Sequence, residues 1–122
     1  MKKISIIFSF IIMLGFVACE YTDIIEDDGS GSVPESVSFS ADIEPIFTTQ
    51  SCTNCHPSMK KPDLSAGNAY ESIMDLGLVN TSNPAESELY TKPSPDGSHG
   101  AKYTSAQAKL VLAWIEQGAK NN

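Results

Sequence analysis

The sequence contains no arginine, and its eight basic residues are lysines that stand against fifteen acidic residues, for a formal net charge of −7 over 122 residues. A chain with this balance cannot neutralise a row of phosphates, so nucleic acid is excluded as a partner. Attraction to anionic lipid by charge alone is excluded for the same reason. A protein partner is expected to present a basic patch, unless the acidic charge serves only solubility.

Cysteine is also scarce, because the chain has only three, at positions 19, 52 and 55. In an exported protein an odd number leaves one thiol without a disulfide partner. Cys52 and Cys55 are separated by two residues and are followed at once by His56. This Cys-x-x-Cys-His pattern is the attachment motif of a c-type haem. The spacing matters because the two thiols add to two vinyl groups on one edge of the porphyrin, while the adjacent imidazole reaches the iron.

Two other interpretations of the motif are open. A structural zinc site needs four ligands, and beyond the motif the sequence offers only one further histidine, His99, and no second Cys or His pair. A redox-active Cys-x-x-Cys dithiol fits the cysteines better, but it normally follows a strand in a βαβ unit, a pattern that this sequence lacks. We therefore expect one covalent haem c with its iron, held through Cys52, Cys55 and His56.

Long apolar runs are absent except at the start, where Lys2-Lys3 precede an apolar run at 4–17. The run is shorter than the ~20 residues of a bilayer-spanning helix and is typical of a secretory leader. It ends at Phe16-Val17-Ala18-Cys19, which resembles the lipobox of bacterial lipoproteins, where a small residue precedes the lipidated cysteine. We expect a lipoprotein signal peptide at 1–18 and lipidation of Cys19. The alternative is an ordinary leader that happens to contain a cysteine.

Without residues 1–18 the chain keeps six lysines and all fifteen acidic residues, a formal charge of −9, and is long enough for one small domain. Residues 19–36 mix acids with Gly, Ser and Pro and are predicted to form a flexible acidic tether. The domain is expected at 37–122. With Cys19 assigned to lipid and the other two cysteines to haem, no thiol is left for a disulfide. Export agrees with the motif, because covalent haem is attached on the periplasmic side of the membrane.

Hydrophobic spacing and capping residues predict an all-α domain, with no strand and no internal repeat. The first predicted helix begins at Ser40 or Asp42 and ends at Gln50-Ser51, and the second spans 69–78 after an Asn68 cap. The third opens at Asn83-Pro84 with Leu89 and Tyr90 inward, and the last runs from a capping box at 104–107 to Gly118. Met74 is expected on the buried face of the second helix. A long loop at 91–103 precedes the last helix, and such loops are often functional.

This order of parts resembles the small class I c-type cytochromes, and more closely the lipoprotein-anchored cytochrome c domains of Gram-negative bacteria. The resemblance is carried by residues 39–47, 52–56, 87–90 and 114–119. It implies a small cytochrome c-like helical domain wrapped around one covalently bound haem. It also implies that Cys52 and Cys55 form the thioethers and that His56 is the proximal ligand of the iron.

The distal ligand of this family usually comes from the loop before the final helix, where many relatives carry a methionine. Here no methionine follows Met74, and the loop instead contains His99. Its neighbours Gly97 and Gly100 are expected to permit close approach of the backbone to the haem. We therefore expect bis-histidine ligation by His56 and His99. Met59, Met74, a lysine or an open site are the alternatives.

An iron with both axial positions filled by protein has no open position for a substrate. The sequence therefore predicts a membrane-anchored, mono-haem one-electron carrier rather than an enzyme, with a lower potential than a His/Met pair would give. It is expected in the bacterial cell envelope, in the outer membrane facing the periplasm or the cell surface, held by the lipid on Cys19 and exchanging electrons with redox partner proteins. The alternatives are a haem-based sensor of carbon monoxide or nitric oxide, and a dithiol oxidoreductase without haem.

Overall fold

The computed structural model describes residues 32–122, and within that range the chain is helical and contains no strand. The elements are a π turn η1 (Phe39–Ile43), α1 (Glu44–Thr49), α2 (Cys52–Cys55), α3 (Ala69–Asp75), a 3₁₀ turn η2 (Pro84–Glu86), α4 (Glu88–Thr91) and α5 (Ser105–Glu116). This confirms the all-α prediction. The leader at 1–18, Cys19 and most of the tether lie outside the described residues.

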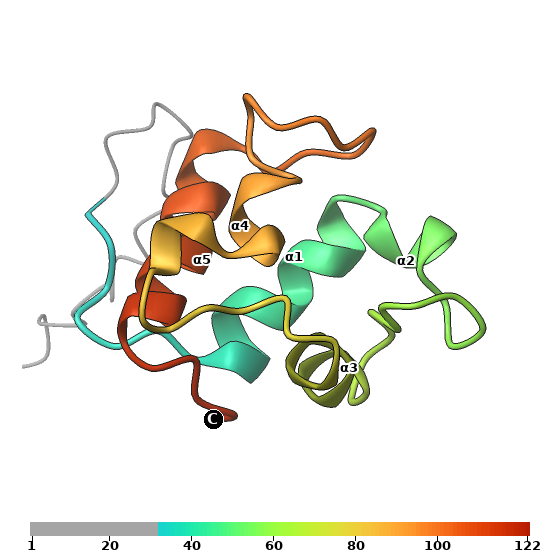
Figure 1. Ribbon diagram of the computed structural model, residues 1–122, viewed down its shortest axis with the longest axis horizontal. Coiled ribbons are helices and arrows are strands. Elements are labelled where there is room, and N and C mark those ends of the chain that lie inside the picture. The colour runs from blue at the N-terminus through green and yellow to red at the C-terminus, as the bar shows by residue number, and fades with distance from the viewer. Residues whose placement is uncertain (1–31) are drawn as a thin grey trace, which may run out of the picture.

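The elements surround α1, which crosses the middle of the molecule in Figure 1. The short α2 lies at one end, α5 at the other, and α3 and α4 flank the space between them (Figure 1). The long loop after α4 extends over the α2 end before the chain enters α5. No helix of residues 32–122 combines the length and the apolar character needed to cross a membrane.

The first helical segment begins earlier than predicted, because its N-cap is Ser38 and not Ser40 or Asp42. Ser38 Oγ accepts a hydrogen bond from Ala41 N at 3.3 Å, and Asp42 Oδ2 accepts one from Ser38 N at 2.7 Å. The Ser38 side chain thus satisfies an N–H group inside the segment, and the Asp42 side chain satisfies the N–H of the capping residue itself, as in a capping box. Pro45 follows in the first turn of α1, where its missing N–H is tolerated. Phe39, Ile43, Ile46 and Phe47, which follow one another at helical spacing, are all buried.

This segment also ends sooner than predicted, because α1 stops at Thr49. Ser51 adopts a left-handed conformation with a φ of +58°, which no right-handed helix contains. The chain then restarts as the one-turn helix α2, so Cys52 and Cys55 lie on a helix of their own. A helical turn brings residues i and i+3 to the same side. The turn therefore presents both cysteines together, followed by His56.

The middle of the chain departs from the prediction in two places. The second helix ends at Asp75 and not at 78, and Gly77 follows with a φ of +65°. Its buried face consists of Ala69, Ser72 and Ile73, so Met74, one residue further round the helix, is 36% exposed instead of buried.

The helix expected after Asn83 is interrupted by Ser87, which lies between η2 and α4. Ser87 is buried, and its Oγ accepts a hydrogen bond from Asn80 N at 2.9 Å. This bond ties the turn to the preceding loop and interrupts the helix. Leu89 is buried as predicted, whereas Tyr90 is only half-buried.

The core lies where η1 and α1 meet α5. The ring centroids of Phe39 and Trp114 are 5.2 Å apart, and Tyr70 from α3 packs edge-on against Phe39 at the same distance. The predicted capping box of α5 is confirmed, since Gln107 N donates to Thr104 Oγ1 at 3.2 Å and Thr104 N donates to Gln107 Oε1 at 2.9 Å. The helix ends at Glu116 with Gln117 as its C-cap, and Gly118, which was predicted to end it, follows with a φ of +96°.

The replacement Thr104→Ala removes the side-chain acceptor of this capping box. We expect it to lower the free energy of unfolding of the mature protein by about 1 kcal/mol, measured by urea unfolding followed with far-UV circular dichroism. Ser105→Ala is the matched control, because Ser105 is exposed in the first turn and should change stability by less than about 0.5 kcal/mol. Equal losses in the two variants would contradict the role of the cap.

Candidate functional site

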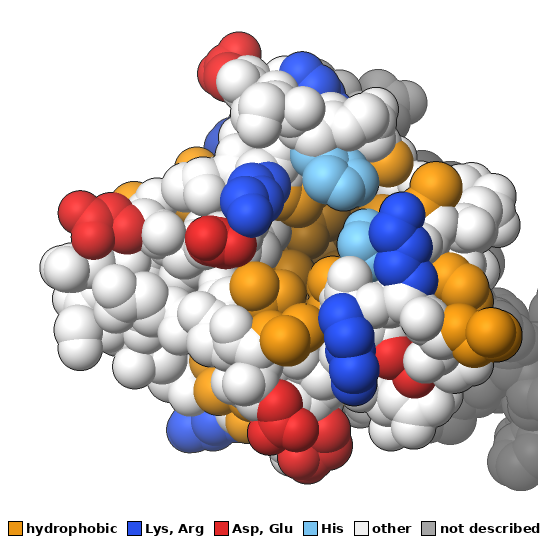
Figure 2. All heavy atoms as spheres, turned by 45° about the vertical axis from the view of Figure 1, so that its right-hand side comes forward, with side chains coloured by type: hydrophobic (Ala, Val, Ile, Leu, Met, Phe, Trp, Pro, Cys, Tyr) orange, Lys and Arg blue, Asp and Glu red, His pale blue; other side chains and the backbone are white. Residues whose placement is uncertain are grey.

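A cleft opens at the α2 end of the molecule, between α2 with the loop after it and α4 with the loop before α5 (Figure 2). It encloses about 800 Å³ of space, counted out to open solvent. The lining residues are Phe47, Cys52, His56, Lys61, Pro62, Leu64, Leu78, Glu88, Leu89, Lys92, Pro93, His99 and Tyr103. The structure thus brings His99 to the same cleft as Cys52 and His56, from which it is distant in the sequence.

His56 enters the cleft from the end of α2. Its backbone is fixed on both sides, because His56 N donates to Cys52 O at 2.9 Å and His56 O accepts from Leu64 N at 3.0 Å. Its imidazole Nδ1, by contrast, is buried and has no hydrogen-bond partner. A histidine that served only the core would have its buried nitrogen paired. Among the described residues this nitrogen has no partner, which is unusual for a histidine that serves only the core.

His99 comes from the loop before α5 and faces the cleft from the opposite side. Its Nδ1 lies 2.9 Å from Ala101 O, and a carbonyl can only accept, so Nδ1 carries the proton. A second contact, from Ala101 N to Nδ1 at 3.3 Å, would need the other tautomer, and we favour the shorter one. The proton on Nδ1 leaves Nε2 with its lone pair free. Proteins orient a metal-binding histidine by such a hydrogen bond from the ring nitrogen that does not bind the metal.

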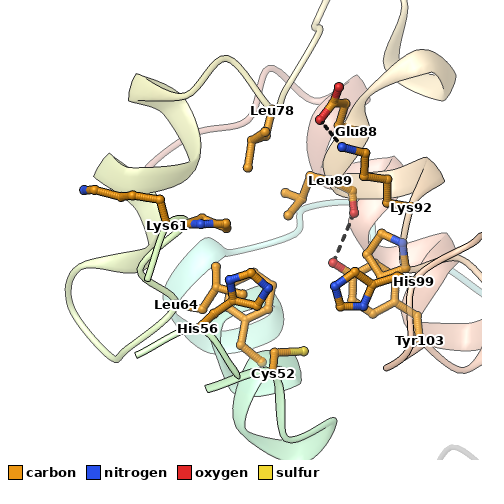
Figure 3. A pocket seen from close by; sticks show the side chains of 13 residues that line it. Cys52, His56, Lys61, Leu64, Leu78, Glu88, Leu89, Lys92, His99 and Tyr103 are labelled. Carbon is orange, nitrogen blue, oxygen red and sulfur yellow. Dashed lines mark hydrogen bonds and ion pairs between the residues drawn. The ribbon is translucent and has the colours of Figure 1, made fainter. Parts of the chain in front are cut away.

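The two imidazole rings lie opposite each other across the cleft (Figure 3). Their centroids are 5.9 Å apart, their planes differ by 29°, and the rings form a stacked pair. Two metal–nitrogen bonds of about 2 Å, together with the distance from each ring centre to its nitrogen, also add up to roughly 6 Å. The centroid separation therefore matches that of two imidazoles on one metal ion, and binding one would need both rings to turn a nitrogen toward it.

Within residues 32–122 no three His, Cys, Asp or Glu side chains converge as a metal site. A porphyrin supplies four nitrogen ligands of its own and asks the protein only for the two axial ones. A histidine pair is thus sufficient for a haem iron, whereas a bare structural metal needs more protein ligands.

The two cysteines of the motif differ in their surroundings. Cys52 is buried and lines the cleft, whereas Cys55 is exposed and does not belong to the lining. Burial raises the pKa of the Cys52 thiol, and the nearby Cys55 raises it further, against the opposing effect of a backbone hydrogen bond. Because the thiolate is the nucleophile in dithiol chemistry and reactive cysteines have lowered pKa values, this environment makes Cys52 a poor nucleophile.

The walls of the cleft include residues that were not expected to form part of a site. Leu64, Leu78 and Leu89 make it apolar, and of these only Leu89 had been predicted to point inward. Tyr103 donates from its hydroxyl to Leu89 O at 3.1 Å and closes the floor of the cleft beside His99 (Figure 3). The alternative ligand Met59 is 95% exposed, and neither it nor Met74 lines the cleft.

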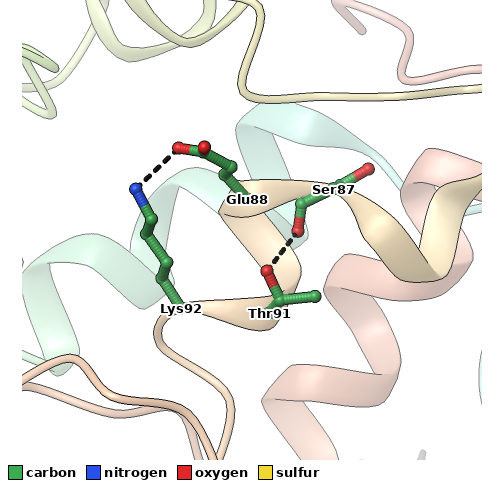
Figure 4. A network of polar contacts seen from close by, with 4 residues as sticks. All are labelled: Ser87, Glu88, Thr91 and Lys92. Carbon is green, nitrogen blue, oxygen red and sulfur yellow. Dashed lines mark hydrogen bonds and ion pairs between the residues drawn. The ribbon is translucent and has the colours of Figure 1, made fainter.

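Lysines stand at the mouth of the cleft, where the surface is locally basic although the protein as a whole is acidic (Figure 2). Lys61 and Lys92 both line it. Lys92 Nζ pairs with Glu88 Oε2 at 2.7 Å, and one turn of α4 is held by Thr91 Oγ1 donating to Ser87 O at 3.0 Å (Figure 4). No pattern in the sequence pointed to these lysines, because their placement depends on how the loops fold.

No protein-family model, no characterised protein and no solved structure matches this chain.

The Tyr103 hydroxyl gives a pH-dependent test of how the cleft floor is built. Burial raises the pKa of Tyr103 above its ordinary value of 10.0, and the Cys52 charge adds to the effect. The folded state holds this proton more tightly than the unfolded chain, so the stabilisation is present below about pH 10 and is lost as the pH rises further. Tyr103→Phe should cost about 1 kcal/mol near neutral pH, because Leu89 O loses its donor, and should weaken the alkaline loss of stability.

The measurement is urea unfolding at about pH 7 and about pH 11. Tyr90→Phe serves as the control, since Tyr90 is half-buried and should leave the alkaline loss unchanged. The assignment fails if Tyr103→Phe loses as much stability between the two pH values as the unmodified protein does.

Proposed function

We propose that this protein is a mono-haem c-type cytochrome that carries one electron at a time. The observation that carries the proposal is the pair of imidazoles, His56 directly after Cys-x-x-Cys and His99 from a distant loop, with ring centroids 5.9 Å apart across an apolar cleft. The unpaired Nδ1 of His56 and the oriented ring of His99 support it.

In this proposal Cys52 and Cys55 hold the haem by thioether bonds, and His56 and His99 are the axial ligands of its iron. When bound, the haem supplies an iron that accepts and releases one electron. The one-turn helix α2 presents both cysteines and delivers His56 into the cleft. The bond from His99 Nδ1 to Ala101 O keeps its Nε2 directed away from that carbonyl. Leu64, Leu78 and Leu89 would give the porphyrin an apolar lining.

Two protein ligands leave no open axial position, and this favours electron transfer over catalysis or gas binding. Lipidation of Cys19 would anchor the protein in the bacterial cell envelope, with residues 19–36 as the tether that lets the domain move between redox partner proteins. The outer membrane, facing the periplasm or the cell surface, is the proposed location. The partners would meet the cleft at a mouth lined by Lys61 and Lys92. They would therefore face positively charged side chains, although the protein as a whole carries a negative net charge.

Covalent attachment of haem is tested by expressing the full chain in a host that matures c-type cytochromes. We expect haem stain to remain with the protein on a denaturing gel, because thioether bonds survive unfolding. The double variant with Cys52→Ser and Cys55→Ser should lose the stain. Cys19→Ser is the control. This variant should keep the haem but should no longer be found in the membrane fraction, because it cannot be lipidated. Unstained wild-type protein, beside a correctly matured control cytochrome, would refute the proposal.

The identity of the distal ligand is tested by His99→Ala. We expect the ferric spectrum to change from low-spin to high-spin, and the reduced protein to bind carbon monoxide, because one axial position opens. Met59→Ala is the matched control, since Met59 is 95% exposed and should leave the spectrum unchanged. An unaltered ferric spectrum in His99→Ala would show that His99 is not the ligand.

A further inference from the structure

The loop that carries His99 is folded back onto the end of α4. His99 N donates to Lys92 O at 3.1 Å, and Tyr103 N donates to Pro93 O at 2.7 Å, which closes the loop at its base. Ser94 Oγ donates to Thr91 O at 2.9 Å at the start of the loop. The carbonyls of Thr91 and Lys92 have no helical partner where α4 ends, and they accept the hydrogen bonds that hold the loop in place.

Gly97 lies against these same carbonyls. A Cβ atom at this position would stand 2.1 Å from Lys92 O and 2.5 Å from Thr91 O. Both oxygens belong to the backbone, so they cannot swing aside as the end of a side chain can. Gly97 is not among the residues with a positive φ, so glycine is required here for space and not for backbone freedom.

Gly100, only three positions further along, is in a different situation. A Cβ atom there would meet nothing within 4 Å, and its φ is also not positive. The structure shows Gly97 pressed against the end of α4 and leaves the space beside Gly100 open. The expectation that the backbone at these glycines approaches a haem stays a prediction.

We infer that Gly97 is the positioning residue for His99, an inference that rests on the proposed function. Any side chain at 97 must push the loop away from α4. Lys92 O is both the atom nearest to where a Cβ at position 97 would stand and the acceptor for His99 N, so this movement breaks the backbone bond of His99 and draws its ring away from His56. The close contact at Gly97 thereby keeps the second axial position closed, and its loss turns an electron carrier into a protein that binds external ligands.

The test compares Gly97→Ala with the matched control Gly100→Ala in the full mature chain. We expect Gly97→Ala to show a high-spin ferric fraction and to bind carbon monoxide when reduced, whereas Gly100→Ala behaves as the wild type. Amide hydrogen exchange at His99, measured by NMR, should be at least about tenfold faster in Gly97→Ala alone. Wild-type spin state, ligand binding and His99 exchange in Gly97→Ala would overturn the inference.

The exchange measurement separates this inference from the proposed function, because it does not need the haem. A wild-type chain without haem would refute the cytochrome, while His99 exchange would still support or overturn the role of Gly97. If Gly97→Ala does not accumulate, Ser94→Ala removes a bond to the same Thr91 carbonyl without adding an atom. It should speed His99 exchange in the same direction, and unchanged exchange would count against the inference.

Discussion

The packing of Phe39 against Trp114, with ring centroids 5.2 Å apart, is the contact on which the arrangement of the site depends. Phe39 begins the segment that leads through α1 to the Cys-x-x-Cys-His motif, and Trp114 lies on the helix that follows the His99 loop. Joining the two fixes where the motif and the loop stand relative to each other. The chain ends reinforce the contact, since Ser40 N donates to Asn122 O and Phe39 N to Asn122 Oδ1, both at 2.9 Å.

The cleft that results combines an apolar lining with two nitrogen ligands and leaves charge at its edge. Burying ionisable groups costs free energy unless they are paired or bound, and the interior of this cleft holds the imidazoles, the Cys52 thiol and the Tyr103 hydroxyl. Burial raises the pKa of the last two. The lysines stand at the mouth, where Lys92 is paired with Glu88. In the proposed function this division suits a buried cofactor whose edge is approached by a partner protein.

The differences between predicted and observed helices have local causes that periodicity does not contain. The predicted first helix was wrong at both ends. Its start lies earlier because the Ser38 and Asp42 side chains bind backbone N–H groups there, and its end lies earlier because Ser51 adopts a left-handed conformation. Met74 was expected inside because it fits a three-and-four repeat with Tyr70. The packing of α3 instead selects Ala69, Ser72 and Ile73 as the inner face. A seven-residue helix carries too few positions for its apolar stripe to define one face.

The sequence by itself determined the helical class, the capping box of α5, and Cys52, Cys55 and His56 as the candidate site, because these depend on residues close together in the chain. It also proposed His99, although only by its place in the order of parts. The tertiary structure decided that His99 faces His56, that three leucines and Tyr103 complete the cleft, and that Gly97 presses on α4. These features join segments separated by tens of residues, and only the packing of the aromatic core brings such segments within contact distance.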